Sequence, residues 1–418
     1  MQKLFAQNRN FRSLLLFVTF GGIGRGMFSI FMMWVVHALY QNPMYTGLAG
    51  FMFGAPLVAS FIFGPLVDRW DKAKVLRVVE FVKFCVVIII LLAHIFYYPG
   101  IWLLLPAILI FSIASLFGSP AFTALLPRIV DGEDLVKANV LINITSVAGG
   151  LGLGAGLLIL MAGDANFAWI YGINATVLLV SVLFALMLRY KEPVDAEKKN
   201  GGSALTSYLE ELKTGFSFVK AGVMLPIVVT TMSMSFFSDV VYVNFPMFAE
   251  VHLGTASGYV LLSALALTGS LVGSYICRAV DSKFELWKIL VAAFIFAGIV
   301  RIVFVNMIAD YRAGGLLLYV LYGGIGSAIG IFYQVLTQKL PPKNLISRVA
   351  TTITSMSAIA AAIGALAGGL LGTFLNVDTV FLIQGGSYII IGVLLCFSRQ
   401  VRKLPKIREL EGAGDAQI

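Results

Sequence analysis

Two ionisable residues interrupt long apolar segments of this sequence, and they are its clearest candidates for chemistry. Arg25 stands in the middle of the apolar run 13–40, and Asp239 stands near the middle of the run 222–249. A charged group at the centre of a membrane costs roughly 2.5–3.5 kcal/mol or more, so each is a functional hypothesis. A carboxyl group there can bind and release a proton, whereas a guanidinium stays charged. We interpret Asp239 as a proton carrier, and Arg25 as a ligand for an anionic group or as the partner of Asp239. The alternative is a purely structural ion pair.

Membrane-spanning helices must position these two residues. Hydrophobic residues make up 59% of the 418 residues and charged residues 12%, and the mean hydropathy is +0.92. A soluble protein carries about 25% charged residues. Backbone groups in lipid must be hydrogen bonded within the protein, so long apolar runs form helices. We predict an all-α membrane protein with twelve transmembrane helices over 12–39, 45–68, 75–96, 101–126, 138–162, 167–189, 222–249, 256–280, 285–307, 314–339, 349–374 and 379–398.

The distribution of basic residues predicts how these helices are oriented. Of the 30 Lys and Arg residues, all but Arg25, Arg301 and Arg312 fall in or near the segments on one side of the membrane, the side of both termini. Basic residues in short loops stay on the cytoplasmic side, so we expect both termini to be cytoplasmic. The net charge of +9 then faces the lipid bilayer, and we expect no nucleic-acid partner.

A polar stretch and an internal repeat divide the chain into two halves. The stretch contains the segment 198–203, whose Lys, Asn, Gly and Ser residues are typical of a linker. The spacing of Gly64 and Arg69 at the second span recurs in Gly273 and Arg278 at the eighth. We predict an N-terminal six-helix half over 1–190, a cytoplasmic linker over 191–221, a C-terminal six-helix half over 222–400 and a cytoplasmic tail over 401–418.

The loop after the second span carries a motif. Its glycine, Asp-Arg pair and two lysines resemble the cytoplasmic loop signature of the major facilitator superfamily, although Asp71 stands where that signature has a second glycine. The resemblance implies the major facilitator fold and a latch that closes one face of a transporter. The alternative is a positively charged loop with one capping acid. We expect a gating loop formed by Gly64, Asp68, Arg69, Lys72 and Lys74, with Gly273 and Arg278 as its counterpart.

Further features resemble the drug:proton antiporter branch of this superfamily, which includes macrolide efflux pumps and enterobactin-type siderophore exporters. They are the segment 135–139 at the start of span five, Pro246 near the end of span seven, and the glycine-rich run 149–156. That run lacks the proline of the antiporter motif and also suits close helix packing. The resemblance implies a multi-pass protein of a bacterial-type inner membrane that exchanges protons with a small-molecule or lipid substrate. We expect a monomer without cofactor or metal.

Aromatic, thioether and amide side chains could line a substrate cavity beside Arg25 and Asp239. Surfaces rich in Met and aromatic residues can repack around different ligands, and amides at membrane depth can bind a polar group. Each of these side chains could instead pack against lipid or another helix. The cavity-lining residues that we predict are Met27, Trp34, Asn143, Phe236, Tyr242, Tyr322 and Gln334.

Other charged residues within spans have local interpretations. Glu80 and Lys83 are three residues apart on span three, which suits an ion pair on one helix. Arg301, in the outer part of span nine, is expected to extend to the membrane surface or to pair with Asp310.

Three functions are compatible with these patterns. The first is a proton-coupled exporter of an amphipathic small molecule, either a drug or a siderophore, that works by alternating access. The second is a lipid translocase of the same fold for a lysophospholipid or glycolipid. The third is a non-transporting membrane receptor or scaffold, which the short outer loops disfavour. The sequence holds no catalytic grouping, phosphate loop or metal cluster, so we expect no enzymatic activity.

Overall fold

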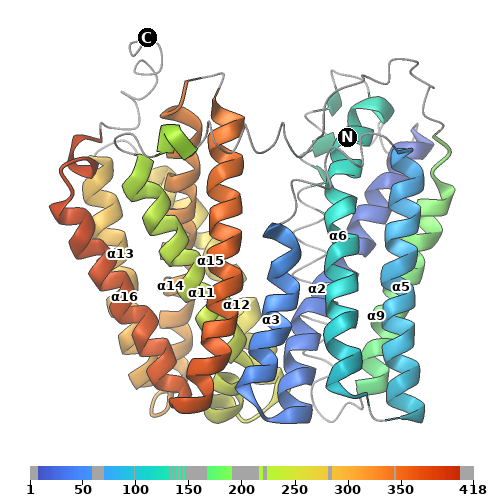
Figure 1. Ribbon diagram of the computed structural model, residues 1–418, viewed down its shortest axis with the longest axis horizontal. Helices are drawn as coiled ribbons and strands as arrows, with labels where there is room; N and C mark the ends of the chain where they lie inside the picture. Colours follow the sequence, from blue (N-terminus) through green and yellow to red (C-terminus); the bar gives the residue numbers. More distant parts are fainter. Residues whose placement is uncertain are drawn as a thin grey trace. The chain divides into compact units, whose positions relative to one another are not determined.

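The protein is all-helical in the residues that its computed structural model describes, and no strand is present among them. Its helices, shown in Figure 1, are α2 (Arg9–Tyr40), α3 (Pro43–Val58), α5 (Lys72–Phe96), α6 (Ile101–Ile129), α9 (Phe167–Met187), α11 (Met224–Leu253), α12 (Ala256–Val280), α13 (Leu286–Ile308), α14 (Arg312–Lys339), α15 (Ile346–Phe374) and α16 (Val377–Phe397), followed by the 3-10 turn Val401–Lys403. The described residues are 8–58, 70–97, 99–130, 134–135, 138–139, 141–142, 145, 167–190, 216–219, 224–280, 285–342 and 345–404.

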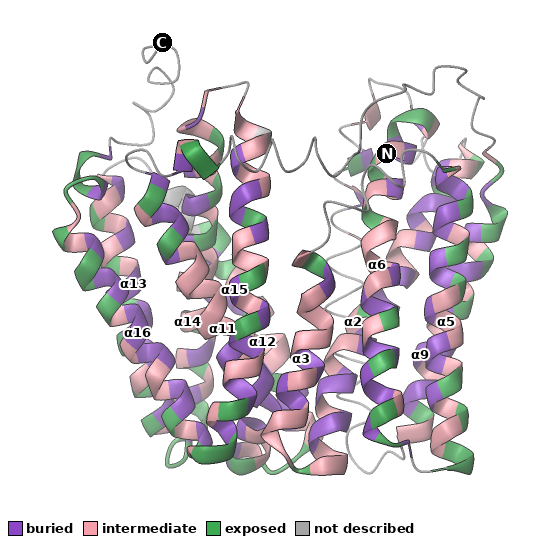
Figure 2. Cartoon of the chain, viewed as in Figure 1, coloured by how far each residue is buried: buried purple, intermediate pink, exposed green. Residues whose placement is uncertain are grey.

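Most of these helices have the properties of membrane spans. Among the described residues, nine helices are long and apolar enough to cross a membrane: α2, α6, α9 and α11–α16. Large apolar side chains are exposed on them, including Trp102 at 87% and Phe374 at 79%, and exposed residues recur along the helices in Figure 2. Such a surface suits contact with lipid. Eleven of the twelve predicted spans overlap a helix. The last part of the second, 59–68, and most of the fifth, 138–162, lie outside the described residues.

Polar side chains at the loop boundaries determine where two helices begin. Asn8 precedes α2, and its Oδ1 accepts a hydrogen bond from the backbone N–H of Phe11 at 2.9 Å. Asp71 precedes α5, and its Oδ1 accepts from the N–H of Lys74 at 2.9 Å. Each side chain satisfies a helical N–H that has no partner in the helix. The acid at position 71 therefore caps α5.

The chain divides into two compact units. The first comprises 1–41, 52–204 and 255–261, and the second comprises 42–51, 205–254 and 262–418. In the first unit α9 packs against α2 and α5, and α5 packs against α6, around a core that includes Phe11, Leu14 and Leu125. In the second unit α13 packs against α14 and α16, and α11 against α15, around a core that includes Phe294 and Tyr388.

Glycines bring α11 and α15 close together in the second unit. Gly364 and Gly368 of α15 lie against the backbone of Phe236 and Val240 in α11, where a side chain would overlap a carbonyl group. Asn244 of α11 adds a hydrogen bond, donating from Nδ2 to the carbonyl oxygen of Gly368 at 2.8 Å. Small residues and interhelical amide bonds of this kind hold membrane helices together. They fix the position of α11, the helix that carries Asp239.

Gly273 lies where α12 packs against α14, and its expected gating role stays a prediction. This glycine lies inside α12, as the predicted span 256–280 implies, and a side chain there would overlap the backbone of Gly324 in α14. Gly269, one turn earlier, also lies against α14. These residues allow two helices of the second unit to approach closely. Arg278 likewise lies within the helix, and its side chain is outside the described part of the structure.

Candidate functional site

Arg25 lies at the middle of α2, where glycines let neighbouring helices approach. A side chain at Gly21 would overlap Glu80 of α5, and one at Gly24 would overlap Leu178 of α9. Asn174 of α9 donates a hydrogen bond from Nδ2 to the carbonyl oxygen of Gly24 at 2.8 Å. The glycines around Arg25 therefore let α2 pack closely on α9 and leave room for the Glu80 side chain of α5.

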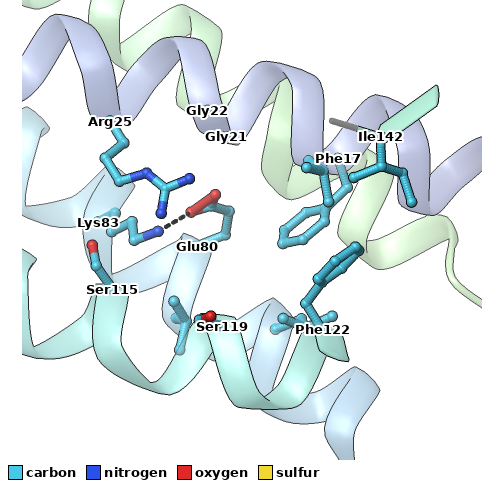
Figure 3. A pocket seen from close by; sticks show the side chains of 14 residues that line it. Phe17, Gly21, Gly22, Arg25, Glu80, Lys83, Ser115, Ser119, Phe122 and Ile142 are labelled. Atoms are coloured by element: carbon cyan, nitrogen blue, oxygen red, sulfur yellow. Dashed lines mark ion pairs between the residues drawn. The ribbon is translucent and has the colours of Figure 1, made fainter. Parts of the chain in front are cut away.

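Glu80 and Lys83 of α5 form the ion pair that their spacing predicts. The Nζ–Oε2 distance is 3.2 Å, and Oε1 of Glu80 accepts a hydrogen bond from Ser181 of α9 at 3.3 Å. The two side chains are buried, with exposures of 2% for Glu80 and 5% for Lys83. Figure 3 shows Arg25, Glu80 and Lys83 pointing toward one another. The pair is therefore part of the charged group around Arg25.

Two cavities meet at Arg25 within the first unit. One, of about 210 Å³, contains Glu80 and Lys83 in its wall. The other, of about 530 Å³, extends between α2, α3 and α6. Both are lined by Arg25, Ser115 and Ser119. Arg25 is exposed to these spaces, and it forms no ion pair with any residue that the structure describes.

Asp239 lines a third cavity, which lies entirely within the second unit. This cavity has a volume of about 560 Å³ and is bounded by α11, α14 and α15. Hydroxyl and amide groups share its wall with Asp239, and no ion pair to this carboxylate forms within the described ranges. The lining residues are Thr231, Met234, Ser235, Ser238, Asp239, Gly330, Tyr333, Gln334, Thr337, Gln338, Ala350, Ile353 and Thr354.

Arg301 of α13 is buried, which corrects the expectation that it extends to the membrane surface. Its side chain is 2% exposed, and its Nε donates to Oε1 of Gln384 in α16 at 2.8 Å, not to Asp310. The guanidinium carbon lies 4.3 Å from the ring centre of Tyr322 and 4.8 Å from that of Phe381. Rings and an amide therefore stabilise this charge.

The Arg301 cluster connects to the helix that carries Asp239. Gln384 donates from Nε2 to the carbonyl oxygen of Phe237 in α11 at 3.2 Å. The hydroxyls of Ser238 and Tyr388 lie 3.3 Å apart, and the Tyr388 ring stacks on that of Tyr322 at 6.3 Å. The two residues that precede Asp239 are thus tied to α16.

The predicted cavity-lining residues have different surroundings. Gln334 lines the Asp239 cavity, and Tyr322 lies against Arg301. Met27 is fully buried and lines neither cavity beside Arg25. Trp34 stacks on Tyr259 at 5.9 Å. Phe236 packs edge to face with Phe237 at 5.1 Å and Tyr242 is half-buried in α11, while Asn143 lies outside the described residues.

Only part of the predicted gating loop is described. Lys72 and Lys74 lie in the first turn of α5, Lys72 buried and Lys74 exposed. Gly64, Asp68 and Arg69 lie outside the described residues, so the latch stays a prediction. The same holds for pairing of Arg25 with Asp239, because the structure describes each residue within its own unit.

Sequence reasoning missed the serines of α6. Ser112, Ser115 and Ser119 all line the cavity of about 530 Å³. Their spacing of three and then four residues places them on one face of a helix, so the signal was present in the sequence. Among the described residues, no group of three or more His, Cys, Asp or Glu side chains could hold a metal ion.

Comparison with known proteins gives one family match and several relatives. The family model described as Major Facilitator Superfamily matches residues 14–365. The chain is 28% identical over 296 residues to the uncharacterized MFS-type transporter YjbB of Bacillus subtilis (strain 168), covering 67% of this chain and 68% of that protein. It is 23% identical over 396 residues to the enterobactin exporter EntS of Salmonella choleraesuis (strain SC-B67), covering 90% of this chain and 88% of that exporter.

Solved structures share the fold at low sequence identity. The nucleoside transporter NupG matches with a TM-score of 0.70 and 13% identity, covering 93% of this chain and 98% of NupG. A D-xylose-proton symporter matches with a TM-score of 0.65 and 13% identity, covering 93% of this chain and 98% of the symporter. At this level of identity, the two matches show that the fold is shared.

Proposed function

The chain belongs to the major facilitator superfamily of membrane transporters, and we propose that it is a secondary active transporter that exports an amphipathic small molecule in exchange for protons. The observation that carries this proposal is the carboxyl group of Asp239. It lies at the middle of an apolar helix, lines a cavity of about 560 Å³ and has no ion-pair partner among the described residues. Such a group can bind a proton from one side of a membrane and release it to the other.

The proposed mechanism is alternating access by two six-helix halves, with both termini in the cytoplasm of a bacterial-type cell. In one state the cavities are open to the cytoplasm, where Asp239 releases its proton and the substrate binds. In the other state they open outward, where a proton binds Asp239 as the substrate leaves. Proton binding and substrate binding then favour different states, which couples the two movements.

The export direction rests on a relative. EntS is named an enterobactin exporter, and the similarity to it extends over 90% of this chain. The Lys and Arg residues gathered at one set of helix ends separately favour both termini in the cytoplasm. A drug and a siderophore are both amphipathic molecules that could enter a cavity of several hundred cubic ångströms.

Dye transport in proteoliposomes tests the role of Asp239. Carboxyfluorescein and rhodamine 6G serve as anionic and cationic probes. A pH indicator inside the liposomes, whose emission does not overlap with that of either dye, reports proton movement. We expect at least one dye to move against protons, and Asp239→Asn to reduce the coupled proton movement at least tenfold. Asp310→Asn removes an exposed carboxylate and should have no effect.

Three results would overturn the proposal. Transport by Asp239→Asn with an unchanged dependence on pH would exclude Asp239 as the proton carrier. Movement of a fluorescent lysophospholipid between leaflets, with no dye transport, would instead support a lipid translocase. Neither dye nor lipid moving would favour the receptor or scaffold.

A further inference from the structure

We propose that the cavity of about 530 Å³ beside Arg25 binds an amphipathic organic anion, and that a single acidic group on an apolar body defines the substrate class of this transporter. The inference rests on the proposed function, and the residues that line the cavity narrow the class of substrate. It concerns only residues of the first unit, so it depends on no arrangement of the two units.

The charges around Arg25, where the two cavities meet, do not balance. Arg25 and Lys83 contribute two positive charges, and Glu80 contributes one negative charge. The Glu80 carboxylate is already engaged, since Lys83 lies 3.2 Å from Oε2 and Ser181 lies 3.3 Å from Oε1. This leaves the guanidinium of Arg25 without a carboxylate partner among the described residues. An unbalanced cation at membrane depth is costly, and a bound anion would offset that cost.

The guanidinium has the geometry for this role. Its planar arrangement of N–H donors binds carboxylate and phosphate groups through two parallel hydrogen bonds. Arg25 is exposed and lines the cavity. Figure 3, drawn at the adjoining cavity of about 210 Å³, shows that its side chain extends from α2 toward α5. An acidic group entering the cavity could therefore reach it directly.

A buried hydroxyl gives independent evidence of a polar ligand. Ser112 lines the same cavity and is 8% exposed, yet its Oγ has no hydrogen-bond partner among the described residues. Buried hydroxyls are nearly always hydrogen bonded, so an unpartnered one indicates a missing partner. Ser115 and Ser119 continue this polar face along α6. Oxygen atoms of an acidic group would supply an acceptor.

The remaining lining of the cavity is mostly apolar. Phe53, Leu57, Phe111 and Leu116 line it, together with Pro56 and Pro120. Aromatic and aliphatic walls with a few polar groups are typical of sites for small molecules. The wall suits the apolar body of a ligand whose acidic group contacts Arg25 and the serines.

The Glu80–Lys83 pair makes the proposal more testable. Because Glu80 neutralises Lys83, Arg25 is the main attraction for an anion in the wild-type protein. Glu80→Gln would remove that neutralisation and leave Lys83 as a second cation near Arg25, in the wall of the adjoining cavity. We expect this variant to bind anions more tightly, a result that a purely structural role for these residues would not produce.

Ligand binding by the full-length protein in phosphatidylcholine nanodiscs tests the inference. The probes are 1-naphthoate and 1-naphthamide, which have similar shapes and differ in charge, measured by equilibrium dialysis. We expect naphthoate to bind at least tenfold more tightly than naphthamide. Arg25→Gln should abolish this preference, Arg25→Lys should retain part of it, and Arg12→Gln, which removes an exposed charge from the same helix, should leave it intact.

Several outcomes would contradict the inference. They are equal affinities for the acid and the amide, no naphthoate binding, or an unchanged preference in Arg25→Gln. Unchanged naphthamide binding and thermal unfolding would show that Arg25→Gln is folded. If variants at Arg25 do not fold, a weaker anion preference in Ser112→Val supports the inference and an unchanged preference contradicts it.

Two further experiments distinguish a soluble anion from a lipid headgroup, and failure of the inference from failure of the proposed function. Adding phosphatidylglycerol to the nanodiscs should displace naphthoate if the anion is a lipid headgroup, and should not if it is a soluble molecule. Asp239→Asn should still bind naphthoate, because binding requires no proton gradient. Naphthoate binding with failed proton coupling would refute the proposed function alone. Coupled transport of rhodamine 6G without naphthoate binding would refute the inference alone.

Discussion

The hydrogen bond between Arg301 and Gln384 gives a quantitative test of how this membrane protein accommodates a buried charge. Arg301 is 2% exposed, Gln384 is 2% exposed, and the Nε–Oε1 distance is 2.8 Å. A hydrogen bond to a charged group contributes about 1.5–3 kcal/mol. Contact of a desolvated cation with an aromatic ring adds about 2 kcal/mol, and Tyr322 and Phe381 provide such rings.

We expect a double-mutant cycle to reveal this coupling. Gln384→Leu leaves the guanidinium buried without an acceptor, and Arg301→Met leaves the Gln384 amide oxygen without a donor, so each should lower the free energy of unfolding. The double variant removes both groups, and its loss should be smaller than the sum of the two losses by about 1.5–3 kcal/mol. Unfolding by sodium dodecyl sulfate in mixed micelles measures the four values.

A control cycle uses a charge that does not contact Gln384. Lys288 lies on the same helix, with its side chain 56% exposed and paired to Glu285. Lys288→Met and Gln384→Leu should therefore be additive. If the Arg301 cycle is also additive within about 0.5 kcal/mol, the two side chains are not coupled, and the explanation of the buried arginine is wrong.

The remaining predictions concern helix packing, capping and the two cavities. Gly368→Ala should lower the free energy of unfolding by about 1–3 kcal/mol because its side chain would meet the α11 backbone. Gly386→Ala, at a position with open space, should raise it by about 0.5–1 kcal/mol. Equal effects of these two changes would contradict the close approach of α11 and α15. Asp71→Ala should cost about 1 kcal/mol by removing the cap of α5, and Asp71→Ser should restore most of it. A similar loss in both variants would exclude capping. Asp239→Asn should uncouple dye transport from proton movement, and Arg25→Gln should remove the preference for naphthoate over naphthamide. An unchanged pH dependence in the first or an unchanged preference in the second would refute the corresponding role.

The sequence by itself determined the helices and the depth of the key charges. Hydropathy is a local property, because a span needs about 20 apolar residues regardless of its neighbours. For the same reason the predicted spans agree closely with the described helices, and Arg25 and Asp239 lie at the middle of α2 and α11. The cap of α5 was also accessible, because Asp71 acts on a backbone group three residues away.

Only the tertiary structure decided which face of each helix contacts other helices and which face is exposed. In a soluble helix the apolar face identifies the core, but in a membrane both lipid and the protein interior are apolar, so hydropathy does not determine the rotation of the helix. Arg301 therefore looked suited to the membrane surface, although Gln384, on another helix 83 residues away along the chain, binds it in the interior. Similarly, the spacing of Glu80 and Lys83 predicted their pairing. Contacts of α2, α5 and α9 through Gly21 and Ser181 decided that this pair faces Arg25.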